Sequence, residues 1–444
     1  MTRRPKNRAL SQLDSFFVAY QECSGILMQS GVEVKLKGRL QRGDLERMLL
    51  HLVSRWPQLG QTLSRRLFGL SWSGRCRVDE MLHSARHQNS LALWRNRPLD
   101  PFREPPFQLL WISENGMSRL AFRAHHAVVD GESFFRVCGE ALRTLARMDN
   151  KGQPVSTGLP ESAKLTDLVS LLRLLGRGKL GGLLRHAAWL RAESRAGRSA
   201  RLTMSACQPG DIATCEWTLD REAFHQLKHQ AEAIGVAPAW LCAAAWMRAI
   251  YAWNVSHDES LNSIVSLEVP VSLRRGRKHD HHLVGNFISP LVLFGDARLT
   301  LEELARKLKK QLMTGIRKQT YLAMPLLTAP ARFLPWVVFR RLAVNPATTG
   351  FATSHFTWFA QEQGIHAEIS NLSRGALQIL AQDIYTPVCL QMGAALAVVA
   401  WPESAQLCLT YRVTAFSRAN AKMLLDFVAS ELNQDYQGRQ QVAV

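Results

Sequence analysis

Two adjacent histidines followed by an Asp-Gly pair form the segment of this chain best equipped for chemistry. His125 and His126 precede three apolar residues, and Asp130 and Gly131 follow them. Imidazole titrates near physiological pH, so a histidine held rigidly at the mouth of a cleft can act as a general base. Asp130 can fix the local backbone by pairing with an arginine, and Gly131 permits a positive φ angle or a close approach that a Cβ would block. The spacing indicates a base beside an anion that organises the turn.

The flanking sequence predicts the elements that position these residues. Residues 120–124 are mostly apolar, which is typical of a strand, whereas residues 133–147 have apolar side chains at helical spacing. The motif therefore lies on a strand-to-helix connection.

The segment from His125 to Gly131 resembles the signature of the chloramphenicol acetyltransferase-like superfamily. This superfamily includes the condensation domains of nonribosomal peptide synthetases, wax ester synthase/diacylglycerol acyltransferases, and related acyltransferases of lipid and polyketide pathways. Other segments resemble further elements of the superfamily in the same order: residues 10–14, 45–59, 98–100, 269–274 and 285–287. Together these landmarks span most of the chain.

The resemblance implies an α/β fold of two sandwich subdomains with an active-site tunnel between them. We expect an N-terminal subdomain at residues 1–160 that carries the histidine motif, and a basic connection at residues 161–205. Residues 206–444 form the expected C-terminal subdomain. The stretch at residues 152–160 is rich in Pro, Gly and Ser, as a connection between subdomains should be.

The resemblance also implies roles for individual residues. His126, the second histidine of the motif, is the expected general base, and His125 is expected to be structural. Either Arg55 or Arg274 can pair with Asp130, and we favour Arg274 because its segment lies at the junction of the two halves in relatives.

Two further residues are expected to support the site. Ser354 is a candidate oxyanion donor, although the next residue is His355 where some relatives carry Asn. Asn286 is expected to organise the interface between the subdomains rather than to take part in the chemistry.

The composition fits a cytoplasmic globular enzyme and excludes several other classes. The chain has 444 residues, of which 47% are hydrophobic and 20% are charged. It has neither the continuous apolar core of a signal peptide nor an apolar run long enough to span a bilayer. Eight scattered cysteines without a C-x-x-C pair indicate reduced thiols. Hydrolase-elbow and P-loop motifs are absent, and the histidines of residues 278–282 fit a solvated loop better than a metal site.

The net charge of +19 predicts anionic partners. Acyl-CoA, an acidic acyl or peptidyl carrier protein that presents a phosphopantetheine-linked donor, and an anionic membrane surface all fit. A nucleic acid does not, because no nucleic-acid-binding signature is present. Residues 164–201 mix nine basic side chains with leucines, which suits either a membrane interface or an interdomain helix with a solvated basic face. We expect a cytoplasmic monomer without a bound cofactor, and the membrane alternative would place it peripherally on the inner membrane face.

Three functions remain open. The first is an acyltransferase that uses an acyl-CoA donor and a hydroxyl or amine acceptor, such as a lipid or a natural-product intermediate. The second is a free-standing condensation enzyme that takes its acyl group from a carrier protein. The third is a non-catalytic member that binds a lipid or a partner. Ala239 and Trp240 stand where wax ester synthases are expected to carry Asn-Asp, which argues against wax or triacylglycerol synthesis.

Replacing Asp130 tests whether this anion is architectural. We predict that Asp130→Asn lowers both thermal stability and activity, because a buried arginine left without its partner costs about 3–5 kcal/mol. Thermal denaturation alongside an activity assay measures both effects. An unchanged melting temperature with abolished activity would instead assign Asp130 a direct chemical role.

Overall fold

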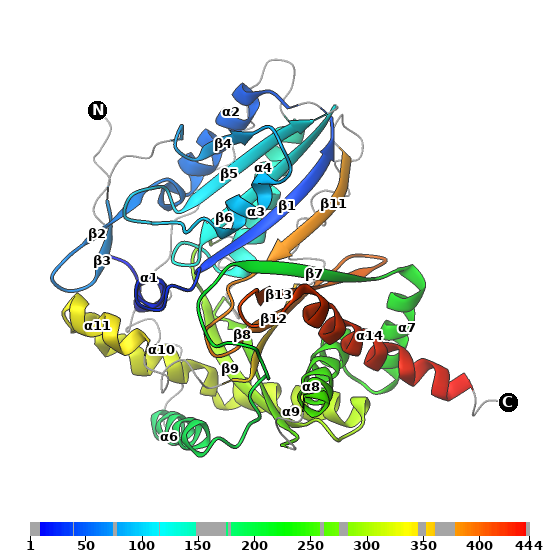
Figure 1. Ribbon diagram of the computed structural model, residues 1–444. Helices are drawn as coiled ribbons and strands as arrows, with labels where there is room; N and C mark the ends of the chain where they lie inside the picture. Colours follow the sequence, from blue (N-terminus) through cyan, green and yellow to red (C-terminus); the bar gives the residue numbers. More distant parts are fainter. Residues whose placement is uncertain are drawn as a thin grey trace.

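Two mixed β-sheets, each covered by helices, form the two lobes of the molecule (Figure 1). The computed structural model describes residues 9–38, 40–73, 78–114, 116–147, 175, 179–257, 262–274, 283–344, 352–359 and 378–440. The expected α/β fold with two subdomains is confirmed. The tunnel between them stays a prediction.

The first sheet has five strands and places the histidine motif at the end of its central strand. Its order is β11-β1-β6-β5-β4, with all neighbours antiparallel except β5 and β4. The strands are β1 (Gln29–Lys37), β4 (Leu82–Ala85), β5 (Phe107–Glu114), β6 (Met117–His125) and β11 (Gln378–Tyr385). Because β6 pairs with β1 from Met117 to His125 and with β5 on its other side, the backbone entering the motif is fixed on both edges.

Helices cover both faces of this sheet. Alternate β1 residues Val32, Val34 and Leu36 pack with α2 (Arg42–Arg55) and α4 (Gly131–Arg147) in one core. On the other face, Glu33 pairs with Arg95 of α3 (Ser90–Asn96). The remaining elements of this half are α1 (Gln12–Ser24), the 3₁₀ turn η1 (Pro57–Leu59), and the hairpin of β2 (Thr62–Arg65) and β3 (Leu70–Ser73).

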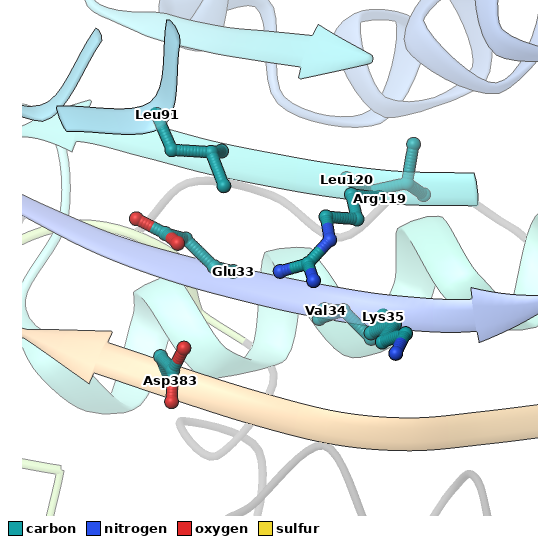
Figure 2. A pocket seen from close by; sticks show the side chains of 7 residues that line it. All are labelled: Glu33, Val34, Lys35, Leu91, Arg119, Leu120 and Asp383. Atoms are coloured by element: carbon teal, nitrogen blue, oxygen red, sulfur yellow. The ribbon is translucent and has the colours of Figure 1, made fainter. Parts of the chain in front are cut away.

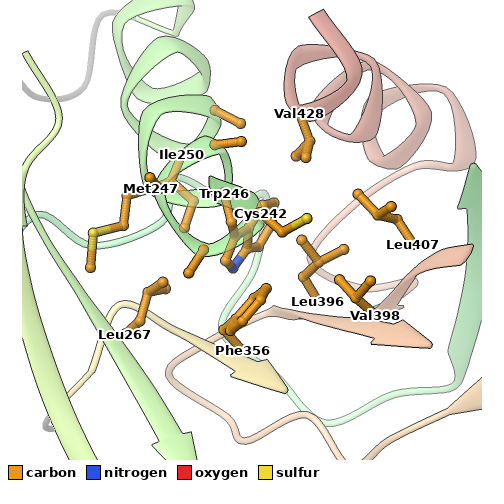
Figure 3. Packing of buried hydrophobic residues seen from close by; sticks show 14 of the residues in the cluster. Cys242, Trp246, Met247, Ile250, Leu267, Phe356, Leu396, Val398, Leu407 and Val428 are labelled. Atoms are coloured by element: carbon orange, nitrogen blue, oxygen red, sulfur yellow. The ribbon is translucent and has the colours of Figure 1, made fainter. Parts of the chain in front are cut away.

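The second sheet has six strands in the order β7-β13-β12-β10-β8-β9. These are β7 (Ile212–Leu219), β8 (Ile264–Ser272), β9 (Ile288–Asp296), β10 (Ser354–Phe359), β12 (Ala394–Ala400) and β13 (Ala405–Arg412). Its helices are α7 (Arg221–Ala233), α8 (Pro238–Ser256), α9 (Leu301–Lys318) and α14 (Arg418–Gln440). Figure 3 shows α8 at the centre of this core, with Trp246 near Phe356 and Leu396 of the sheet.

Two further helical segments lie outside the two sheets and their main helices. The connection contains α6 (Leu180–Ala196), and the proline-broken apolar stretch at residues 322–342 folds into η3 (Thr320–Leu322), α10 (Ala323–Thr328), η4 (Ala329–Phe333) and α11 (Trp336–Ala343). Among the described residues no single helix is long and apolar enough to cross a membrane. The pair α7 and α8 passes that test only together, with a bend of 98° between them.

The division of the chain differs from the expected one. β11, which falls within residues 206–444, pairs with β1 and so belongs to the first sheet. Its Tyr385 lies over Gly31 of β1, where a Cβ would collide with the tyrosine ring. The side-chain period of a strand carries no information about its partner, so sequence alone could not detect this crossover. Residues 148–174 and 176–178, which include the Pro/Gly-rich connection, lie outside the described residues.

The crossover also brings the carboxylate of Asp383 on β11 close to that of Glu216 on β7. Figure 2 shows a hollow on the first sheet lined by Glu33, Val34, Lys35, Leu91, Arg119, Leu120 and Asp383, none of which belongs to the histidine motif. Burial, followed by a hydrogen bond and charge repulsion from Glu216 of β7, raises the pKa of Asp383 to about 6, while Arg95 and Arg119 oppose the rise. The ionised form of Asp383 therefore destabilises the folded state.

We predict that Asp383→Asn stabilises the protein at pH 7.5 but not at pH 4. With the folded pKa raised, the folded state binds more protons than the unfolded chain between about pH 4 and pH 6, so parent stability falls across that window and the loss is complete above it. Asparagine removes the charge and can still donate to Glu216. Chemical denaturation at both pH values measures the difference, and an equal effect at pH 4 and pH 7.5 would contradict this account.

Candidate active site

His126 lies on the turn between β6 and α4, where both its backbone and its ring are held in place. Its backbone N–H donates to the carbonyl of Met28 at 2.7 Å. The imidazole stacks on the ring of Phe17 from α1, with centroids 4.0 Å apart and an interplanar angle of 15°. Backbone and side chain are therefore both fixed.

Asn286, from the second half of the chain, reaches the His126 ring. Its Nδ2 donates to Asp14 Oδ1 at 2.8 Å and to the His126 carbonyl, while its Oδ1 lies 3.1 Å from His126 Nδ1. A carboxylate and a carbonyl only accept hydrogen bonds, which fixes the amide orientation. Asn286 was expected to organise the interface, and it contacts the histidine directly as well.

This network assigns the tautomer of His126. The amide oxygen of Asn286 can only accept, so His126 Nδ1 carries the proton and Nε2 keeps its lone pair. Burial lowers the pKa of His126, and its own backbone, Asp130 and Asn286 oppose this shift with smaller effects. The charge of His355 adds a further small lowering of the pKa. The ring is therefore neutral at physiological pH and can accept a proton at Nε2.

Asp130 forms a buried ion pair with Arg274. The guanidinium meets the two carboxylate oxygens at 2.9 and 3.1 Å, and the two side chains are 0% and 1% exposed. The backbone N–H groups of Ser133 and Phe287 donate to the same carboxylate at 2.7 and 2.8 Å. Burial alone would raise the pKa of Asp130, but Arg274 and these hydrogen bonds hold it below its ordinary value. Asp130 is thus a fully paired anion that also caps α4.

The same ion pair fixes the segment that carries Asn286. Asp130 N–H donates to the Gly285 carbonyl at 3.1 Å, and Ser133 Oγ bonds both the carbonyl and the N–H of Gly285. The residues on either side of Asn286 are therefore tied to the start of α4, which directs the amide toward His126.

Gly131 and His125 shape the turn. Gly131 allows close packing between the lobes, because a Cβ there would come within 2.8 Å of the Phe359 ring on β10. His125 is fully buried, and its Nδ1 accepts from Ala127 N–H at 3.0 Å. Burial lowers the pKa of His125 to about 3, with a smaller effect of His126 in the same direction. This geometry suits a neutral structural histidine.

Two of the expected supporting residues lie elsewhere. Arg55 pairs with Glu140 of α4 at 3.3 Å and lies over the ring of Trp56, so it is not the partner of Asp130. The Ser354 hydroxyl donates to the carbonyl of Ala394 at 2.8 Å and accepts from Trp246 of α8. It therefore faces the second core and does not serve as the expected oxyanion donor.

His355, the neighbour of Ser354, faces the opposite side of β10 and is close enough to His126 for its charge to lower the pKa of that histidine. Its Nε2 lies 2.5 Å from Thr357 Oγ1, and its Nδ1 lies 3.7 Å from Glu268 on the paired strand β8. Ser354 and His355 face opposite sides of β10 because adjacent side chains alternate along a strand.

Sequence reasoning also missed Asp14 and Phe17. Residues 10–14 contribute to the family resemblance, and within them Ser11 and Asp14 form the capping box that starts α1. That box was a readable signal for a helix start. The contacts of Asp14 with Asn286 and of Phe17 with His126 depend on the packing of α1 between distant segments.

No metal centre is formed by the described residues, which contain no cluster of three or more potential ligands. The histidines at residues 278–282 lie outside the described part of the chain, as does Cys76. The other seven cysteines are unpaired.

Comparison with solved structures identifies the fold across nearly the whole chain. The first condensation domain of the calcium-dependent antibiotic synthetase, in complex with a substrate analogue, matches with a TM-score of 0.70 and 12% identity over 97% of this chain and 96% of that domain. The TRI3 trichothecene 15-O-acetyltransferase from Fusarium sporotrichioides gives 0.72 and 14% over 96% and 94%. The X-domain from teicoplanin biosynthesis gives 0.65 and 16% over 98% and 96%.

These likenesses confirm the resemblance drawn from the motifs. The chain has the fold of these condensation domains and of the trichothecene acetyltransferase, as the resemblance implied. No family model matches the chain, and no curated protein matches its sequence.

The assigned tautomer gives a prediction that needs no substrate. In the parent protein, nitrogen NMR of the His126 imidazole should report a protonated Nδ1 and an unprotonated Nε2. Asn286→Ala removes the acceptor, so the Nε2–H tautomer should become populated. Asn96→Ala is a matched control, because the Asn96 amide also joins the two lobes but bonds the backbone of Ile212 rather than the histidine. An unchanged tautomer in Asn286→Ala would contradict the assignment.

Proposed function

We propose that the protein is an acyltransferase that moves an acyl group from a thioester donor to a hydroxyl or amine acceptor, with His126 as general base. The observation that carries the proposal is the Asn286 contact to Nδ1, which leaves Nε2 of a neutral imidazole free to accept a proton. The buried ion pair of Asp130 and Arg274 supports it by holding the segment from which Asn286 projects.

The reaction is direct transfer without a covalent enzyme intermediate. The acceptor oxygen or nitrogen attacks the thioester carbonyl while its proton moves to His126 Nε2. The tetrahedral intermediate then collapses, the carbon–sulfur bond breaks, and the departing thiolate takes the proton from Nε2. The products are an ester or amide and a free thiol, and His126 is again neutral.

In this proposal the developing oxyanion needs a hydrogen-bond donor near His126, and Ser354, the residue expected from the sequence, faces the second core instead. His355 is close enough for its charge to lower the pKa of His126, but its ring nitrogens face Thr357 and Glu268. A hydrogen-bond donor aimed at the developing negative charge typically contributes about two to three orders of magnitude to the rate.

The donor is acyl-CoA or an acyl group on the phosphopantetheine arm of an acidic carrier protein, and the net charge of +19 attracts either one. The relative named a 15-O-acetyltransferase supports transfer to a hydroxyl group, and the relative named a condensation domain supports a free-standing condensation enzyme. A lipid- or partner-binding member without turnover is the third candidate, and the free Nε2 of His126 argues against it. We place the protein in the cytoplasm as a monomer, peripheral to the inner membrane face.

We predict that His126→Ala abolishes acyl transfer and keeps the fold, with a rate loss of about a hundredfold to ten-thousandfold. Mass spectrometry of products formed from acyl-CoA and acyl-carrier donors, offered with hydroxyl and amine acceptors, measures the activity. His225→Ala is the matched control, because His225 is an exposed histidine paired with Glu403.

The outcomes separate the three functions. Products formed only from acyl-CoA identify an acyltransferase, and products formed only from the carrier-bound donor identify a condensation enzyme. If neither donor gives a product, the protein is a binding protein. Near-parental turnover by a correctly folded His126→Ala variant would eliminate the role of His126.

A further inference from the structure

Large apolar side chains are exposed together on one side of the molecule. The β2–β3 hairpin presents Leu67 and Phe68 at its tip, with exposed fractions of 73% and 56%. Beside it, η4 and α11 present Phe333 and Val337, with exposed fractions of 61% and 56%. Val338 and Leu342 of α11 are exposed as well. We call these six residues the apolar crown.

The crown is one continuous structure. The N–H of Trp336, at the start of α11, donates to the carbonyl of Leu67 at the hairpin tip at 3.3 Å. Glu22 of α1 pairs with Arg65 of the hairpin and, at 3.7 Å, with Arg340 of α11. Figure 1 shows the hairpin and α11 side by side at the left of the view. Trp336 and Phe339 pack in the first core, so the opposite face of α11 is exposed to solvent.

The segments that form the crown carry only positive charge, and Glu22 of α1 pairs with two of their arginines. Residues 62–73 and 329–344 contain no Asp or Glu, and they contain five arginines: Arg65, Arg66, Arg332, Arg340 and Arg341. Apolar side chains at a hairpin tip and on one face of a helix, with arginines next to them in the sequence, suit a bilayer interface that carries anionic headgroups.

We propose that the apolar crown docks the protein on an anionic lipid bilayer. A bilayer accepts a projecting hairpin tip and a helix without a complementary groove, whereas a protein partner would need one. The arginines select anionic headgroups, and the net charge of +19 acts in the same direction.

The crown adjoins the wall of the candidate active site. Val344, the residue after α11, packs in the same apolar cluster as Phe17 and Tyr20 of α1, and Phe17 stacks on His126. This step rests on the proposed function: a bilayer-docked acyltransferase would take its acceptor or its acyl chain from the class of membrane-partitioned lipids.

Vesicle flotation of the full-length protein tests the docking without any assay of turnover. The probes are phosphatidylcholine vesicles with and without phosphatidylglycerol, at low and high salt. We expect binding to the anionic vesicles that weakens with salt. Phe68→Asp combined with Val337→Asp should weaken this binding about a hundredfold, because each large apolar side chain is worth about tenfold or more.

The matched control is Leu50→Asp combined with Leu93→Asp. These leucines of α2 and α3 have exposed fractions of 56% and 75% and lie outside the crown, so the control should bind vesicles like the parent. His126→Ala should also bind like the parent. The crown variant should keep its activity on water-soluble substrates, which separates a failure of docking from a failure of the proposed chemistry.

Three results would overturn the proposal. The first is a parent protein that does not float with anionic vesicles, and the second is equal binding by the crown variant and its control. The third is a lipid-free dimer in sedimentation analysis that the crown variant dissociates, since the occupant would then be a second copy of this chain.

Discussion

A buried ion pair between Asp130 and Arg274 is the interaction on which the candidate active site depends. The two side chains come from different lobes and are sealed from solvent. Such a pair is tolerable only when hydrogen bonds satisfy the remaining polar atoms, and backbone N–H groups of Ser133 and Phe287 do so at the carboxylate. Its consequence is geometric, because it ties the start of α4 to the segment that holds Asn286.

From that segment the constraint reaches the chemistry in two hydrogen-bonded steps. Asn286 is oriented by Asp14 and by the His126 carbonyl, and its remaining oxygen fixes the proton on His126 Nδ1. α1, the motif turn and the β8–β9 connection therefore all contribute to one imidazole. The close approach of Gly131 to Phe359 and the crossover of β11 into the first sheet hold the lobes in the arrangement that this network requires.

Sequence reasoning predicted what depends on local pattern. The strand before the motif and α4 after it follow from apolar spacing, and Asp220 caps α7 as expected of an Asp before a helix. The motif and its companions also identified the fold.

Sequence could not predict that β11 joins the first sheet, because strand pairing across about 350 residues leaves no local signal. The sequence motif indicates Ser354 as a residue of the site, but packing alone decides which face of β10 meets the other lobe, and Ser354 lies on the opposite face. Arg55 was weighed against Arg274 by motif alone, and only the fold directs Arg55 toward Glu140.

If Asp130 acts on His126 through Asn286, the effects of replacing the two residues must be coupled, and a double-mutant cycle measures that coupling. The rate of acyl transfer would be measured for the parent, Asp130→Asn, Asn286→Ala and the double variant, each under conditions where it is fully folded. The account predicts strong non-additivity, with the double variant little slower than the slower single variant, because both changes break the same chain of contacts. Rate losses that multiply would show that the two residues act independently and would contradict the account.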